Sequence, residues 1–278
     1  MTTGKLQKQP PSKTVKYHFV KLVYRSLLFL AALIVYIVSV CRGADSAFIT
    51  SPHIQAILHL IWIVYVVEML FRFFPAKIES MGCQKQFAHN YRPVKQLTEK
   101  PKRTSARSTA LVVISWVSLN GLFGILYFLN IIDAGILFLI SLAYGVCDMI
   151  CILFFCPFQT WMMKNKCCTT CRIYNWDFAM MFTPLMFVWN YLSLSLVLLS
   201  LALLIKWEIL LYRYPERFLE ETNQCLSCGS CREKLCHHKK QLRGFLKKNR
   251  GILQLSGNTL FQTKEELRKA VKHIKKYK

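Results

Sequence analysis

Residues 131–155 read IIDAGILFLISLAYGVCDMICILFF and contain no Lys or Arg. An α-helix rises about 1.5 Å per residue, so about 20 apolar residues cross the hydrocarbon core of a bilayer. Cys156-Pro157 follows the run, and proline cannot continue a helix. The stretch therefore predicts a transmembrane helix that ends before its proline.

Four further apolar stretches occur in the chain. Three are long enough for one crossing each, and the fourth, Phe178–Tyr212, is too long for one and short for two. Pro184 and Asn190 divide it into a short tilted helix or re-entrant segment, Phe178–Trp189, and a full span, Leu192–Leu211. We therefore expect an all-α polytopic membrane protein, a bundle of five to six transmembrane helices with one short or re-entrant. The single crossings are Val23–Cys41, Ile54–Phe74 and Thr109–Leu129.

The chain is also strongly basic, with 37 Lys and Arg against 14 Asp and Glu, a formal net charge of +23, although 54% of its residues are hydrophobic. A soluble nucleic-acid-binding protein would not carry such long apolar runs, and a disordered basic chain would be far less hydrophobic. The two kinds of residue are instead separated: 34 of the 37 Lys and Arg lie in segments 1–25, 75–107, 157–177 and 213–278.

This charge asymmetry predicts an orientation, because cytoplasmic segments of membrane proteins retain Lys and Arg. We expect an even number of crossings of the cytoplasmic membrane, with both termini in the cytosol. The predicted parts are a basic N-terminus, a transmembrane bundle with two cytosolic loops, and a Cys-rich basic tail. Their bounds are 1–22 for the N-terminus, 23–212 for the bundle, 75–107 and 157–177 for the loops, and 213–278 for the tail.

Twelve cysteines are present, and the last seven fall in segments predicted to face the reducing cytosol, which favours metal or redox chemistry over disulfides. The run Cys225, Cys228, Cys231 and Cys236 has two successive two-residue gaps, a spacing that suits a 4Fe-4S cluster. Zinc is the alternative, held by Cys225 and Cys228 with Cys236 and His237 or His238. Reactive thiols without metal remain a third interpretation.

A second group, Cys167, Cys168 and Cys171, precedes the short segment Phe178–Trp189. Cys168 and Cys171 have the two-residue gap of a redox pair or half of a metal site, and Cys167 would be a third ligand. Acylation or simple packing is the alternative. Both Cys-rich segments are predicted to be cytosolic, so they could also join in one site.

Inside the span at 131–155, Cys147, Asp148 and Cys151 are spaced to lie near one face of the helix. A carboxylate within a span usually faces the bundle interior or water, so Asp148 is a candidate functional residue. Cys156 is expected to lie off that face unless Pro157 distorts the end of the helix. Glu68 and Arg72, four residues apart in the second span, predict a salt bridge.

Cys151, the motif Cys156-Pro157-Phe-Gln-Thr-Trp161 and the run Cys225 to Cys236 together resemble membrane-bound ferredoxin-type proteins of the NapH and NosR kind. The resemblance covers roughly residues 147–236. It implies electron transfer between a membrane quinone pool or flavoprotein and a redox partner protein through iron-sulfur centres.

Near the C-terminus, Thr263-Lys-Glu-Glu266 has capping-box spacing and predicts a helix from Lys264 to about Tyr277. One narrow apolar stripe and many lysines favour binding to anionic lipids of the inner leaflet over nucleic acid.

The sequence thus predicts an integral membrane redox protein with a cytosolic iron-sulfur cluster. Two alternatives stay open: a metal-ion transporter or sensor with a zinc-binding tail, and a scaffold whose Cys site is structural. No catalytic triad, phosphate-binding Gly loop or paired-carboxylate motif is visible in the sequence. Any activity is therefore expected to be electron transfer rather than hydrolysis or group transfer.

Overall fold

The computed structural model describes residues 13–41, 52–75, 82–94, 106–165 and 167–227, with residues 229, 231, 236 and 239. Over these residues the secondary structure is helical, apart from an isolated β-bridge between Pro93 and Asn223. The chain divides into two compact units, Met1–Leu235 and Cys236–Lys278. The fold below is that of the first unit. The predicted helix Lys264–Tyr277 lies outside the described residues.

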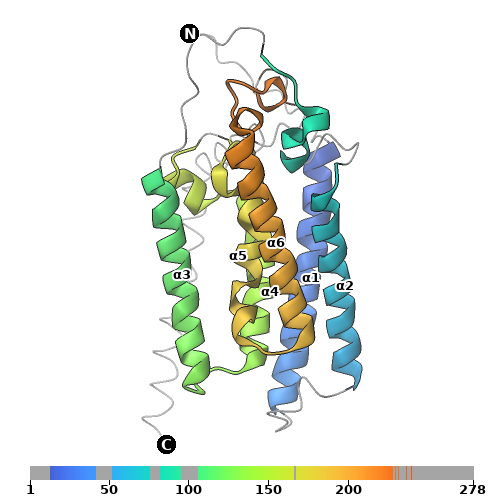
Figure 1. The fold of residues 1–278 in the computed structure, drawn as a ribbon. Coiled ribbons are helices and arrows are strands. Elements are labelled where there is room, and N and C mark those ends of the chain that lie inside the picture. The colour runs from blue at the N-terminus through green and yellow to red at the C-terminus, as the bar shows by residue number, and fades with distance from the viewer. Residues whose placement is uncertain are drawn as a thin grey trace, which may run out of the picture. The chain divides into compact units, whose positions relative to one another are not determined.

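The described part of this unit contains six α-helices and seven shorter helical segments (Figure 1). The α-helices are α1 Lys13–Cys41, α2 Pro52–Phe73, α3 Ala106–Phe128, α4 Ala134–Leu153, α5 Asp177–Phe182 and α6 Tyr191–Arg213. The 3-10 helices are η1 Gly82–Gln86, η2 Ala88–Asn90, η4 Arg172–Trp176, η5 Thr183–Phe187, η6 Pro215–Arg217 and η7 Gln224–Leu226, and η3 Phe158–Met162 is a π-helix.

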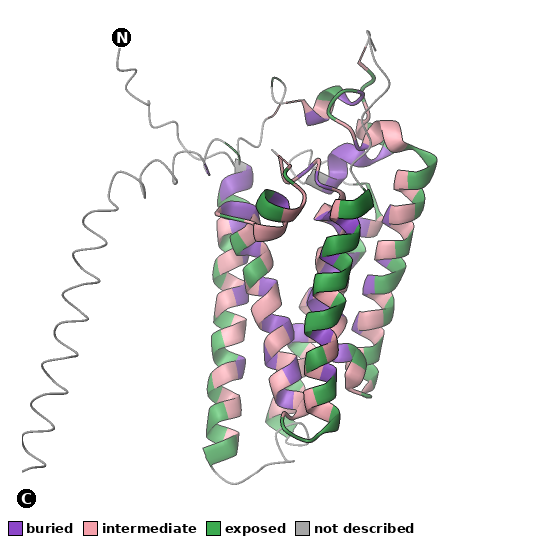
Figure 2. Ribbon diagram, turned by 90° about the vertical axis from the view of Figure 1, so that its left-hand side faces the viewer, coloured by how far each residue is buried: buried purple, intermediate pink, exposed green. Residues whose placement is uncertain are grey.

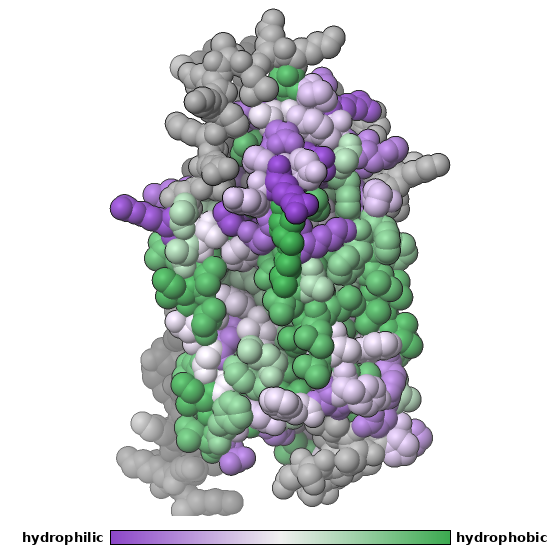
Figure 3. Space-filling view, in the orientation of Figure 1, coloured by the Kyte–Doolittle hydropathy of each residue, from purple (hydrophilic) through white to green (hydrophobic). Residues whose placement is uncertain are grey.

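Five of the helices, all except α5, are long and apolar enough to cross a membrane. Figure 3 shows their hydrophobic side chains as a broad band between more hydrophilic ends, and Figure 2 shows the exposed residues on the outer helix faces. Exposed aromatic residues mark the two ends, Trp189 and Tyr191 at one and Trp161 and Tyr212 at the other. Such girdles are typical of membrane interfaces. The prediction of an all-α fold with helices long and apolar enough to cross a membrane is confirmed.

The short segment before α6 crosses the bundle and is not re-entrant. Asp177, at its start, contacts Arg72 in the last turn of α2, whereas Phe187, at its end, packs on Phe128 at the end of α3. The ends of the segment therefore contact opposite ends of the bundle. Asn190 then caps α6 by accepting a hydrogen bond from the Leu192 N–H at 3.3 Å. Five long helices and one short pass therefore run between the two ends of the bundle.

Helix α1 begins at the end of the bundle where α2, α4 and α6 finish. We call this end the loop end. Val15 of α1 is buried against Met149 and Leu153 in the last turns of α4. Lys206 of α6 donates a hydrogen bond to the Phe73 carbonyl at the end of α2. Loops 75–107 and 157–177 thus start and finish at one end of the bundle, as the charge pattern predicts.

Two helix boundaries differ from the predicted spans. The first helix begins at Lys13 and not near Val23, because Val15 packs on α4 and carries the helix into the segment predicted as a separate N-terminal part. The fourth helix ends at Leu153, and the chain is no longer α-helical when it reaches Cys156.

Close packing of α4 against α2 and α5 depends on Gly145. A Cβ atom at this position would lie 2.8 Å from the Tyr65 hydroxyl and 2.9 Å from the Met181 sulfur. Tyr65 and Met181 are both buried in the largest hydrophobic cluster of the bundle. The glycine therefore permits the contact that encloses the centre of the molecule.

At the loop end, residues 82–94 and 214–227 are bonded through their backbones. The Gln224 N–H donates to the Arg92 carbonyl at 2.9 Å, and the Val94 N–H donates to the Thr222 carbonyl at 3.2 Å. The fully buried Asn223 side chain adds a bond to the Lys85 carbonyl at 3.0 Å. These bonds place the start of the Cys-rich tail beside the loop that follows α2.

Candidate functional site

A cavity of about 260 Å³ lies among α3, α4, α5 and the loop that joins α4 to α5. Its wall is mainly apolar and aromatic, with Trp116, Tyr144 and Tyr174 among the lining residues. Five cysteines and two aspartates also line it: Cys147, Cys151, Cys156, Cys168, Cys171, Asp148 and Asp177.

Helix α4 brings Cys147, Asp148 and Cys151 to the cavity. Their spacing of three and four residues places them near one face, as the sequence predicts. All three residues line the cavity, and Cys147 is also exposed.

Cys156 lines the same cavity, although it lies beyond the end of α4. Helix α4 stops at Leu153, and the N–H groups of Phe154 and Phe155 both donate to the Ile150 carbonyl. This change of direction, just before Pro157, turns Cys156 back toward α4. The Cys156 thiol is hydrogen-bonded to that of Cys151.

Cys168 and Cys171 come to the cavity from the loop after η3. The Cys168 thiol donates a hydrogen bond to the Gln159 side-chain oxygen at 2.8 Å. Cys171 is 5% exposed, and this burial raises the pKa of its thiol to about 12. Cys167 instead contacts the Thr169 hydroxyl at 3.1 Å. The three thiols therefore bond separate partners and do not converge as one ligand set.

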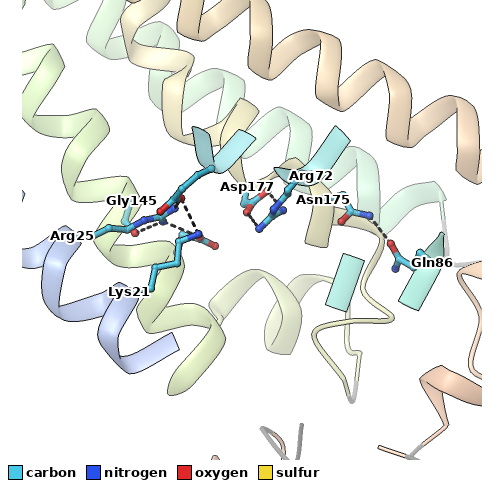
Figure 4. A network of polar contacts seen from close by, with 9 residues as sticks. Lys21, Arg25, Arg72, Gln86, Gly145, Asn175 and Asp177 are labelled. Carbon is cyan, nitrogen blue, oxygen red and sulfur yellow. Dashed lines mark hydrogen bonds and ion pairs between the residues drawn. The ribbon is translucent and has the colours of Figure 1, made fainter. Parts of the chain in front are cut away.

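The opposite side of α4 carries a buried charge network (Figure 4). Arg25 of α1 donates to Glu68 at 2.5 Å, to Asp148 at 3.2 Å and to the Gly145 carbonyl at 2.9 Å. Lys21 contacts the same Glu68 oxygen at 2.8 Å. Arg25 is 1% exposed, so the two carboxylates compensate a charge that burial alone would strongly disfavour.

A second ion pair holds the other carboxylate of the cavity. Arg72 and Asp177 contact each other through two nitrogen–oxygen pairs, at 2.7 and 2.6 Å. The Arg72 guanidinium also lies 4.9 Å from the centre of the Phe178 ring. Glu68 and Arg72 thus bind different helices, and the salt bridge predicted between them is wrong, because each meets a buried charge of opposite sign.

Sequence reasoning did not assign Lys21, Arg25 and Asp177 to the site. The available signal was their position, because charged residues in or beside apolar runs require partners. The sequence does not show which partner each one meets. Tertiary packing selects Glu68 and Asp148 for Arg25.

The predicted tail site is only partly within the described residues, which include Cys225, Cys231 and Cys236 and leave out Cys228, His237 and His238. The Cys225 thiol donates to the Asn90 carbonyl at 3.1 Å. The Lys85 ammonium lies 4.0 Å from the Cys231 sulfur. Among the described residues, no three His, Cys, Asp or Glu side chains are grouped to hold a metal ion.

Comparison with known proteins gives no match: no family model, no curated protein and no solved structure is similar to this chain.

Proposed function

We propose that this chain is an integral membrane redox protein that uses the thiols of the cavity. The observation that carries the proposal is the gathering of five cysteines, from α4 and from the following loop, around one apolar cavity. In the sequence these residues form two groups. Thiol–disulfide exchange requires thiols within reach of one another, and the shared cavity brings these thiols together.

The reactive pair in this proposal is Cys151 and Cys156, whose thiols are hydrogen-bonded. Oxidation forms one S–S bond and releases two protons and two electrons. A membrane quinone would accept both at its two carbonyl oxygens and become the quinol. The apolar, aromatic wall and the volume of about 260 Å³, near the lower end for small-molecule pockets, suit a single-ring head group.

Asp148 has a supporting role as a proton acceptor at the same cavity. It lies three residues before Cys151 on one helix face and is bonded to Arg25 at 3.2 Å. The arginine holds the carboxylate toward the centre of the bundle. A proton that leaves the dithiol would therefore meet an oriented carboxylate and not bare hydrocarbon.

The predicted 4Fe-4S cluster in the tail stays a prediction. A cubane cluster needs four thiolates. Of the expected set, Cys228 lies outside the described residues, and Cys225 donates its proton to the Asn90 carbonyl. We therefore derive no electron-transfer step through the cluster.

The test is quinone reduction by the full-length protein in detergent, with decylubiquinone or menadione as the probe and thiol alkylation read by mass spectrometry. We expect equimolar quinol and a Cys151–Cys156 disulfide in the wild type. Both should be lost in Cys151→Ser and Cys156→Ser. Cys41→Ser is the matched control, because Cys41 is exposed at the far end of α1.

Absence of quinol and of the disulfide would overturn the redox proposal. If the reduced protein instead binds stoichiometric zinc and moves it into proteoliposomes, and if Asp148→Asn abolishes that flux, the transporter alternative is favoured. Destabilisation by Cys225→Ser, in a protein with no redox or transport activity, would favour the scaffold.

A further inference from the structure

The cavity contains a second pair of thiols that the proposed reaction does not use. Cys168 and Cys171 are separated by two residues, as in many redox-active pairs, and both line the same space as Cys151 and Cys156. A single dithiol is sufficient to reduce a quinone. The second pair therefore calls for a function of its own.

Gln159 connects the two pairs. Its backbone N–H donates to the Cys156 sulfur at 3.4 Å, and its side-chain oxygen accepts from the Cys168 thiol at 2.8 Å. The Gln159 side-chain nitrogen donates to the Asn165 carbonyl at 3.0 Å, which fixes the amide between η3 and the loop. Gln159 is 8% exposed. One buried residue thus holds a thiol of each pair.

We infer that Cys156 and Cys168 exchange a disulfide bond, with Gln159 as their positioning residue. The two pairs then form an internal relay between the membrane cavity and the loop end. This inference rests on the proposed redox function and names the thiols that receive its oxidising equivalents.

The exchange is balanced without any further oxidant. The Cys168 thiolate attacks the Cys156 sulfur of the Cys151–Cys156 disulfide, and Cys151 leaves as a thiolate that takes up a proton. Cys171, after losing its proton, attacks the Cys168 sulfur and releases Cys156. One disulfide has moved, and two protons have passed from the loop pair to the membrane pair. The reverse sequence regenerates the starting state.

Two features of the structure support this order. The Gln159 N–H that points at Cys156 stabilises negative charge on that sulfur when it leaves. Cys156 also lies outside the α-helical part of α4, so its sulfur can change partner without breaking that helix. Cys171 is the more buried member of the loop pair, which suits the thiol that acts second.

The relay is tested by trapping its mixed disulfide. In Cys151→Ser/Cys171→Ser the resolving thiol at each end is absent, so mild oxidation of the full-length protein with diamide should join Cys156 to Cys168. Peptide mapping by mass spectrometry detects the cross-link. The matched control is Cys151→Ser/Cys168→Ser, in which Cys156 should form no cross-link with Cys171.

Gln159→Ala should slow transfer from the membrane pair to the loop pair by about 10²-fold, the scale of loss for a misplaced reacting group. Formation of the Cys151–Cys156 disulfide should be unchanged, and Gln159→Glu, which keeps an acceptor oxygen, should restore much of the transfer rate. A purely structural role would instead reduce both steps.

The outcomes separate the two proposals. If quinone oxidises Cys151 and Cys156 but no Cys156–Cys168 cross-link forms in the trapping variant, the relay is wrong and the redox proposal stands. A cross-link of Cys156 to Cys171 in the control would also overturn the relay as written. If diamide gives the cross-link and quinone oxidises nothing, the relay geometry stands and the quinone reaction fails. Size-exclusion profiles that match the wild type exclude misfolding of the variants.

Discussion

Polar groups on two sides of helix α4 are bonded in different ways inside the bundle. Toward α1 and α2, charged side chains are paired at short distances, with Arg25 bonded to two carboxylates and a backbone carbonyl. Toward α3 and α5, thiols are hydrogen-bonded to neutral partners such as Gln159. Asp148 belongs to both sides.

The difference has a physical reason. Moving one member of a buried ion pair leaves an uncompensated charge, so the network holds its helices in place. A thiol is a weak hydrogen-bonding group and loses little when it changes partner. The network side is therefore suited to fix the bundle, and the cavity side is suited to react.

Arg25→Met should produce the largest loss of stability, because it leaves Asp148 buried without its partner Arg25 and Glu68 with Lys21 alone. We expect the free energy of unfolding to fall by about 3–5 kcal/mol. Unfolding in mixed micelles with increasing SDS measures it. Arg213→Met, at an exposed position in the last turn of α6, should change stability by less than about 0.5 kcal/mol. Equal effects of the two variants would contradict the assigned role of the network.

Gly145→Ala tests the packing that supports the network, because the added Cβ would meet Tyr65 and Met181 within 3 Å. Overpacking of this kind costs about 1–3 kcal/mol. Gly121→Ala in α3 is the control, since nothing lies within 4 Å of a Cβ there and the change should be neutral or stabilising. The same unfolding assay compares the two variants, and a neutral Gly145→Ala would show that α4 has room to shift.

Alkylation of Cys171 tests the cavity side as a function of pH. Only the thiolate reacts, and an ordinary thiol, with a pKa near 8.5, reaches its maximum rate above about pH 9. Burial raises the pKa of Cys171 to about 12, so its rate in the folded protein should keep rising about tenfold per pH unit up to about pH 11. Iodoacetamide labelling followed by mass spectrometry measures this rate. A plateau near pH 9 would place Cys171 in contact with solvent.

Arg172→Gln should have the smallest effect on the free energy of unfolding. Arg172 pairs with Glu208 at 2.7 Å, almost as closely as Arg25 pairs with Glu68, but its side chain is 31% exposed. Partly exposed pairs contribute about 1 kcal/mol or less and weaken with salt. Unfolding at low and high ionic strength should show this. A loss as large as that of Arg25→Met would mean that distance, and not burial, sets the strength of these pairs.

Much of the fold could be predicted from the sequence because long apolar runs leave the backbone few alternatives in a bilayer. The runs around Ile131–Phe155 and Leu192–Leu211 each became a helix close to its predicted bounds. The start of α1 could not be predicted, because it depends on the packing of Val15 against α4. The pairing of Glu68 with α1 depends likewise on which helices become neighbours.

For the site too, the sequence could predict some positions and not others. The spacing of Cys147, Asp148 and Cys151 was sufficient to place them on one face. The spacing could not show that Cys156 lines the same cavity, because the position of Cys156 depends on how the chain turns after Leu153. The role of Gln159 could not be predicted, since a single glutamine two residues after a proline carries no specific signal of its own.

The sequence by itself determined that this chain is helical, with five helices long and apolar enough to cross a membrane, because hydrophobicity acts through composition along the chain. Tertiary structure alone decided which thiols share a cavity and which carboxylate meets which arginine. The ion pairs join residues far apart along the chain, such as Arg25 with Glu68 and Asp148, and the thiols meet through the turn of the chain after Leu153. No local pattern encodes such contacts, because they form only when the helices have packed.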